Sequence, residues 1–261
     1  MVQHAHCLLL LACTVGVASS VSGDRADPQL QFSQVIQGGV LQHGERTAVW
    51  GEGAKAGATV VVTLHTSPVA VVHTKAESSG LWELMLPAQP AAWHVQLSAV
   101  SDGVSTNTSV SIGVVVQCAG QSNMDMPVAC HLPNRTACFH PKLAFHADNG
   151  TAEVAAAGRY TDKIFMLKAV NSKYERVNKP HWQTSTPTAA YNDYPAAFSA
   201  VCWYTGKNLF EKLGGNTPVG LLQTSVGGSP IEYWLPPKSG SAHAPVNVNS
   251  CERDIPQCDN Q

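Results

Sequence analysis

Between residues 30 and 113, short runs of β-branched and apolar residues are interrupted about every ten residues by Gly, Pro, Ser or Asp. In the run LWELMLP (81–87), Trp82, Leu84 and Leu86 fall on one face of an extended chain. Short strands at this spacing are typical of a β-sandwich or jelly roll. The predicted strands are 48–53, 58–65, 69–75, 81–87, 93–100 and 106–116.

The hydrophobic pattern changes after residue 113. IFMLKAV (164–170) is a continuous apolar run of the kind that forms a parallel strand buried on both faces. PVGLLQTSV (218–226) is a second such segment, and residues 112–118 form a third. A predicted helix lies between the strands 164–170 and 218–226. The order of strands and helix therefore predicts βαβ units and a parallel sheet. A β domain is thus followed by an α/β domain.

Residues 195–215 repeat apolar side chains at three-, four- and seven-residue spacing, which predicts a helix over 196–213. Asp193 or Tyr194-Pro195 marks its expected start, and Gly214-Gly215 its end.

Composition excludes several classes of function. A formal net charge of -2 without a basic run gives no electrostatic footprint for nucleic-acid binding. The 11 His are scattered and do not form a cluster with metal-site spacing, so we expect no metal site and no cofactor. The 44% hydrophobic fraction is that of an ordinary globular protein.

The N-terminus predicts export. Cys7–Val17 is an apolar stretch followed by small residues, as in a signal peptide, and cleavage is expected near Ala18–Gly23. An uncleaved buried N-terminal helix is the alternative. A membrane span needs roughly 20 apolar residues, and none is predicted elsewhere. We expect the protein in the secretory pathway, either extracellular or lysosomal.

Cysteines and glycosylation sequons agree with export. Cys130/Cys138 and Cys251/Cys258 are short-range pairs in polar loops, where disulfides are expected. Cys118 and Cys202 lie in apolar contexts and are interpreted as possible buried thiols. The three sequons begin at Asn107, Asn134 and Asn149.

Residues 118–127, CAGQSNMDMP, place Ser122 just after the apolar run 112–117. A serine nucleophile needs a turn that exposes its hydroxyl, an adjacent base and N–H donors for the oxyanion. If the strands ending at Ser122 and at Gly227-Gly228 are parallel in one sheet, both features lie at the same edge. An ordinary strand-ending turn is the alternative for each.

These residues carry a resemblance to a known family. CAGQSNMDMPV (118–128) resembles the Gly-Gln-Ser-Asn-Met signature of the sialate O-acetylesterase family, a branch of the SGNH hydrolases. VLQHGERTAVWGEGAKAGATVVVTL (40–64) resembles the start of that family's N-terminal β domain. Residues 198–234 resemble its downstream helix, strand and Gly-Gly-x-x-Ile-Glu-x-Trp block, and Trp182 fits its pattern. The resemblance covers only the family's N-terminal part.

The resemblance implies hydrolysis of O-acetyl esters of sialic acids or related sugars. Ser122 would be the nucleophile, and its own N–H would be one oxyanion donor. Gly228 or Gly227 would be a second donor, with Gly228 favoured. Gln121 and Asn123 match the motif as supporting residues of the turn, and Cys118 matches a common structural Cys.

The sequence also departs from this family. Gly113-Val114-Val115-Val116 stands where the family usually has Gly-Asp-Val-Trp. The family carries its base on an Asp-x-x-His, and no Asp in this sequence has a His three residues on. His181 and His243 lie in predicted loops and are interpreted as surface residues.

Taken together, the expected architecture is an incomplete SGNH-hydrolase-like α/β fold with a flavodoxin-like parallel sheet, preceded by an all-β sandwich. The predicted divisions are a signal peptide (1–23), the β-sandwich domain (24–111) and a truncated α/β domain (112–261). Two hypotheses follow. One is a secreted or lysosomal serine esterase, weakly active or inactive in this form. The other is a non-catalytic secreted protein that binds carbohydrate or protein.

Overall fold

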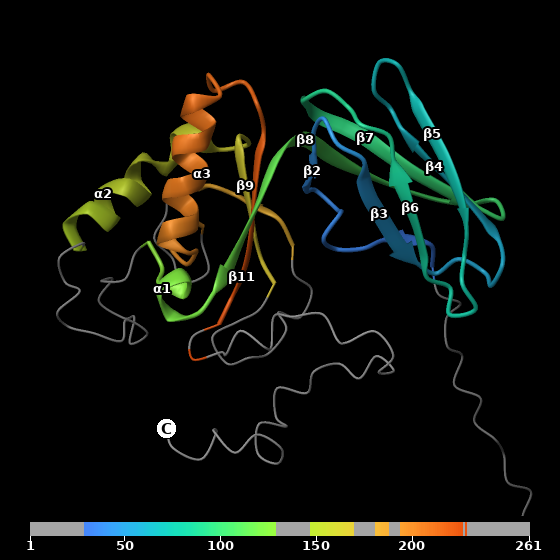
Figure 1. Cartoon of the computed structure of the whole chain (residues 1–261), viewed down its shortest axis with the longest axis horizontal. Helices are drawn as coiled ribbons and strands as arrows, with labels where there is room; N and C mark the ends of the chain where they lie inside the picture. The colour runs from blue at the N-terminus through green and yellow to red at the C-terminus, as the bar shows by residue number, and fades with distance from the viewer. Residues whose placement is uncertain (1–28, 129–146, 170–180, 188–193, 227, 229–261) are drawn as a thin grey trace, which may run out of the picture.

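A computed structural model of the chain describes residues 29–128, 147–169, 181–187, 194–226 and 228. This part is mostly β-sheet with few helices, arranged as a three-stranded sheet and an eight-stranded sheet (Figure 1). No helix within these ranges has the length and apolar character needed to cross a membrane. The predicted signal segment and several predicted site residues lie outside the described ranges: Gly227, Asn134, His243, Cys130, Cys138, Cys251 and Cys258.

The first part of the chain, which we call the β part, consists mainly of antiparallel pairs around one apolar core, and β2 alone among its strands pairs in parallel, with β8. In the three-stranded sheet the order is β1-β3-β6, and β4, β5 and β7 belong to the eight-stranded sheet. Buried residues alternate with exposed ones along β4 and β6, as the predicted strands require. The strands are β1 (Gln31–Phe32), β2 (Val40–Gln42), β3 (Thr47–Glu52), β4 (Thr59–Leu64), β5 (Ala70–Lys75), β6 (Trp82–Leu86) and β7 (Ala92–Ser101).

The longest strand, β8 (Val104–Gly120), joins the two halves of the molecule. Its first half pairs antiparallel with β7 across an Asp102-Gly103 turn, in which both residues have positive φ. Its second half pairs in parallel with β11 (Val219–Ser225). The predicted strands 106–116 and 112–118 are therefore one continuous strand, and the predicted boundary between residues 111 and 112 falls inside it.

The second half of the molecule, which we call the parallel part, is built on strands in the order β9-β11-β8. β9 (Ile164–Lys168) and β11 are parallel, and β10 (Gln183–Thr184) adds an antiparallel edge. All four residues from Ile164 to Leu167 are buried, as expected for a strand covered on both faces. The predicted strands at 164–170 and 218–226 and their parallel pairing are confirmed.

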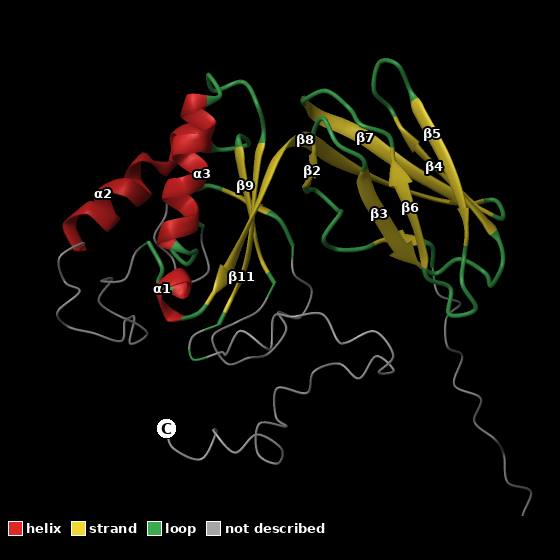
Figure 2. Cartoon of the chain, in the orientation of Figure 1, coloured by secondary structure: helices red, strands yellow, loops and turns green. Residues whose placement is uncertain are grey.

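The helices lie together on one side of the parallel sheet (Figure 2). They are α1 (Ser122–Asp125), α2 (Ala147–Ala156), the 3-10 helix η2 (Ala157–Tyr160) and α3 (Ala200–Lys212). Gly206 allows α3 to approach the sheet, since a Cβ at that position would lie 2.6 Å from Leu221 Cδ1 on β11. The start of α3 is tied to the end of β11 by the Ser199 N–H, which donates to Gln223 Oε1.

The predicted start of the long helix was wrong. α3 begins at Ala200, where Ser199 caps it by accepting a hydrogen bond from the Cys202 N–H at 3.2 Å. Ala196 and Phe198 are fully buried, so their side chains continue the helical periodicity although the backbone there forms turns. The predicted end is confirmed, because Gly214 and Gly215 follow the helix with positive φ.

On the opposite face of the parallel sheet, the start of β11 contacts the β part and Trp182. The Trp182 indole N–H donates to the Val35 carbonyl at 2.7 Å. At Gly220 a Cβ would lie 2.8 Å from the Val40 Cβ and 3.3 Å from the Trp182 ring, so this glycine makes room for both. Trp182, which fits the family pattern, thus contacts both the β part and the parallel part.

Candidate active site

The candidate nucleophile lies on a tight turn between β8 and α1. β8 ends at Gly120, whose φ of 143° is a conformation that favours glycine. The N–H groups of Met124 and Asp125 both donate to the Gln121 carbonyl, which closes the first turn of α1. Ser122 is exposed at the start of this turn, and its Oγ donates to Gln121 Oε1 at 3.1 Å. The expected strand, turn and exposed hydroxyl are therefore present.

The two strand ends that the sequence singled out lie side by side. In the parallel register Gly120 of β8 is opposite Ser225 of β11, and the Val226 N–H donates to the Gly120 carbonyl at 3.0 Å. Gly228 follows three residues after the end of β11 and is exposed, with a φ of 77°. Ser122 and Gly228 thus follow strands that end at the same edge of the sheet, as predicted from the sequence for parallel strands.

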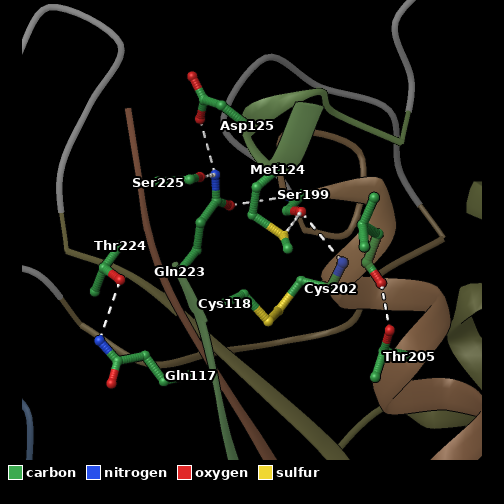
Figure 3. Close-up of a disulfide and its surroundings, with 11 residues drawn as sticks. Gln117, Cys118, Met124, Asp125, Ser199, Cys202, Thr205, Gln223, Thr224 and Ser225 are labelled. Carbon is green, nitrogen blue, oxygen red and sulfur yellow. Dashed lines mark hydrogen bonds between the residues drawn. A yellow bond between two sulfur atoms is a disulfide. The ribbon is translucent and has the colours of Figure 1, made fainter. Parts of the chain in front are cut away.

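A disulfide joins Cys118, near the end of β8, to Cys202 in the first turn of α3 (Figure 3). The two Cα atoms are 5.9 Å apart and both side chains are buried. The interpretation of these residues as buried thiols was wrong. Their apolar contexts arise because β8 and α3 pack directly against each other, which brings the sulfurs together. The bond fixes the strand only four residues before Ser122.

A buried amide behind the turn connects α1, β11 and α3. Gln223 is fully buried, and its Nε2 donates to Asp125 Oδ1 and to Ser225 Oγ, both at 2.9 Å (Figure 3). Its Oε1 accepts from the Ser199 N–H at 2.9 Å. One side chain therefore ties the end of α1 to the strand beside it and to the cap of α3.

Asp125 also forms an ion pair with Lys168 at the end of β9, with 3.0 Å between Nζ and Oδ1. The two side chains are only 18% and 14% exposed, so water screens the pair less than it screens a surface pair. Asp125, Lys168 and Gln223 were all missed by sequence reasoning. A signal was available at Gln223, a long polar side chain that directly follows the apolar run VGLL of a predicted buried strand.

The general base of an Asp-x-x-His is not among the residues of this sequence. His181 is exposed and immediately precedes Trp182. Burial raises the pKa of Tyr194 to about 12, so its hydroxyl keeps its proton near neutral pH and cannot act as a base there. In the described ranges no three His, Cys, Asp or Glu side chains gather in a way that suits a metal ion.

Two of the three predicted sequons begin within the described ranges. Asn107 lies on β8 and is exposed. The backbone of Asn149 belongs to α2. Asn123 is exposed beside Ser122 on α1.

Comparison with known proteins agrees with this geometry. No protein-family model matches the chain. Over 199 residues it is 28% identical to sialate O-acetylesterase of Homo sapiens, covering 71% of this chain and 34% of that protein. Over 198 residues it is 30% identical to the Mus musculus enzyme, covering 71% and 33%. The chain thus spans about a third of the length of these relatives.

A solved structure gives a similar result. The crystal structure of a carbohydrate acetylesterase from Xanthomonas citri matches with a TM-score of 0.61 and 25% sequence identity, covering 79% of this chain and 42% of that one. The sequence matches, this structural match and the GQSNM turn lead to one conclusion. The chain is a relative of the sialate O-acetylesterases, a group of carboxylic ester hydrolases of the SGNH type.

Proposed function

We propose that this chain carries the nucleophile side of a serine esterase site that acts on O-acetyl esters of sialic acids or related sugars. The observation that carries the proposal is the exposed Ser122 hydroxyl on a turn held at the carboxyl edge of parallel strands. The relatives named as sialate O-acetylesterases and as a carbohydrate acetylesterase support this substrate class.

In this mechanism Ser122 Oγ attacks the acetyl carbonyl carbon and loses its proton to a base. The carbonyl oxygen becomes an oxyanion, which the Ser122 N–H and a glycine N–H from Gly228 or Gly227 would stabilise. Collapse releases the sugar hydroxyl and leaves an acetyl-serine, which water then hydrolyses to acetate. Gln121 Oε1 accepts the Ser122 hydrogen bond and orients the hydroxyl, but a neutral amide is too weak a base to take its proton.

The expected rate of ester hydrolysis depends on the general base, and this sequence contains no Asp-x-x-His. In the serine-protease example, loss of the base alone costs on the order of 10⁶ in kcat, and about 10³–10⁴ over the uncatalysed reaction remains. We therefore expect the 261-residue chain to be nearly inactive, and a polypeptide that extends it with an Asp-x-x-His to be active.

The test compares hydrolysis of an acetyl ester and of an O-acetylated sialic acid by the 261-residue chain and by such an extended polypeptide. Ser122→Ala should abolish activity of the extended form. Ser105→Ala, at an exposed position on the same strand, is the matched control and should leave it unchanged. Full-rate, Ser122-dependent hydrolysis by the short chain would contradict the account of the base. Undiminished activity of the extended Ser122→Ala variant would remove the nucleophile assignment.

The absent base also favours a second candidate, a non-catalytic secreted protein that binds carbohydrate or protein. This candidate predicts that the 261-residue chain retains an acetylated glycan without releasing acetate. Glycan-array binding together with an acetate assay separates the two, because binding without any Ser122-dependent acetate release in either form supports the second.

We further propose that the protein enters the secretory pathway through a signal peptide at residues 1–23 and acts outside the cell or in the lysosome. The Cys118–Cys202 disulfide supports an oxidising compartment. The finer architecture we propose is a sandwich domain over 24–111 followed by an SGNH-type α/β domain, with β8 shared between them.

A further inference from the structure

The outer face of the eight-stranded sheet carries three exposed valines on β4, β5 and β7. Val61, Val71 and Val100 are 36%, 62% and 45% exposed. On each of these strands the neighbouring positions are turned to the core, so the three valines point away from it. Exposed aliphatic side chains that adjoin one another on a sheet favour self-association unless something covers them.

The strand register shows that the three valines are neighbours. Val61 of β4 is directly opposite Val100 of β7, and opposite His73 of β5 on its other side. Val71 precedes His73 by two residues and is therefore diagonal to Val61. Directly opposed Cβ atoms lie about 5 Å apart and diagonal ones about 7–8 Å apart, so the valines form one continuous surface, the valine face.

Asn107 adjoins the valine face on the next strand. It is opposite Ser98 of β7, and Val100 is diagonal to it. Ser98 lies between Leu97 and Ala99, both fully buried, so Ser98 and Asn107 share the outer side of the sheet. Asn107 is exposed and begins the sequon Asn107-Thr108-Ser109.

We propose that Asn107 carries an N-linked glycan that lies over the valine face and keeps the protein monomeric. In the secretory pathway a lipid-linked oligosaccharide diphosphate is the donor. Asn107 Nδ2 loses a proton and bonds to C1 of the first N-acetylglucosamine, and the C1–O bond to the diphosphate breaks, releasing the lipid diphosphate. From Asn107 the valines lie one to three strands away, at the strand spacing of about 4.8 Å, which the branched core of an N-glycan spans.

The first experiment tests the modification. The full chain is expressed in an animal cell line and recovered, and peptide mass spectrometry after peptide N-glycosidase reports conversion of Asn107 to Asp. Ser109→Ala, which destroys the sequon but keeps Asn107, should abolish this conversion. Ser109→Thr, which keeps the sequon, should preserve it. An unmodified Asn107 in the recovered wild-type chain, whether secreted or retained in the cytosol, overturns the proposal.

The second experiment tests the covering role by sedimentation velocity. The Ser109→Ala chain should lose most of its monomer peak at a concentration at which the wild-type and Ser109→Thr chains remain monomeric. Val61→Thr with Val100→Thr, added to Ser109→Ala, should restore the monomer. A monomeric Ser109→Ala chain, or failure of the threonines to restore the monomer, overturns the covering role. The esterase proposal is tested separately, because Ser122→Ala affects neither readout.

Discussion

The β part and the parallel part of this molecule are held together by different means. The core of the β part is a cluster of aliphatic and aromatic residues, and its ion pair, Lys55–Asp102, is long at 3.9 Å and exposed. The parallel part adds the Cys118–Cys202 disulfide and two partly buried ion pairs, Asp125–Lys168 at 3.0 Å and Glu153–Lys207 at 2.7 Å.

The two parts also differ in how much of their strand pairing is local. In the β part, β4 with β5 and β7 with β8 are hairpins whose partners are adjacent in the chain. The parallel part must bring β8 against β11, about one hundred residues later, and against α3. The disulfide and the partly buried ion pairs are thus found in the part whose central strands are parallel and which carries the candidate site.

Among the changes that test this comparison, removal of the disulfide should have the largest effect on the free energy of unfolding. Cys118→Ala with Cys202→Ala should lower the free energy of unfolding by about 2–5 kcal/mol, because the bond closes a loop of 84 residues. Urea unfolding followed by circular dichroism measures the change. Each single variant should cost nearly as much as the double variant, since either one breaks the bond. A double variant as stable as wild type would show that the parallel part does not need its covalent tie.

Loss of the buried Gln223 amide should have the second largest effect on the free energy of unfolding. Gln223→Leu removes the acceptor for the Ser199 N–H and a donor to Asp125, so we expect a cost of about 1–3 kcal/mol. Gln117→Leu is the matched control on the same sheet, where the amide is exposed and donates to Thr224 Oγ1 at 3.3 Å, and it should change stability by less than about 0.5 kcal/mol. Equal costs for the two leucines in urea unfolding would mean that Gln223 has no special place in the site.

The two ion pairs should differ clearly, and the exposed pair should show the smallest effect of all. Lys55→Ala should change the free energy of unfolding by less than about 0.5 kcal/mol, because both partners are exposed. Lys168→Ala should cost about 1–3 kcal/mol, because Asp125 then loses the cation that balances its partly buried charge. Thermal unfolding of the two variants at low and high salt measures both, and a larger loss at Lys55 would reverse the comparison.

The sequence predicted what depends on local pattern. Alternation and turn residues located most strands of the β part, and apolar runs located β9 and β11. It did not predict that β8 is continuous, because the first half of that strand alternates apolar and polar residues whereas the second half is an apolar run, and the two patterns indicate two strands. The Asp102-Gly103 turn that starts this strand was a signal left unused.

The candidate site shows the same division. The GQSNM segment identified Ser122 and its turn, since the motif and its strand lie together in the chain. Other contacts of the site depend on which segments pack side by side, and the spacing of residues along the sequence does not reveal this. These are the contacts of Asp125, Lys168 and Gln223 and the Cys118–Cys202 bond. The start of α3 was wrong for a related reason, because burial of Ala196 and Phe198 imitates helical periodicity.

The continuity of β8 also sets an order of events while the chain is being made. When β8 leaves the ribosome, β7 and β2 are already available to pair with its first half. Its second half waits for β11, which at about 5–20 residues per second arrives roughly 5–20 seconds later. During that interval Cys130 and Cys138 have been synthesised but Cys202 has not. The native bond beside Ser122 therefore forms only if Cys118 stays reduced until Cys202 is made or is released from an earlier partner by thiol–disulfide exchange.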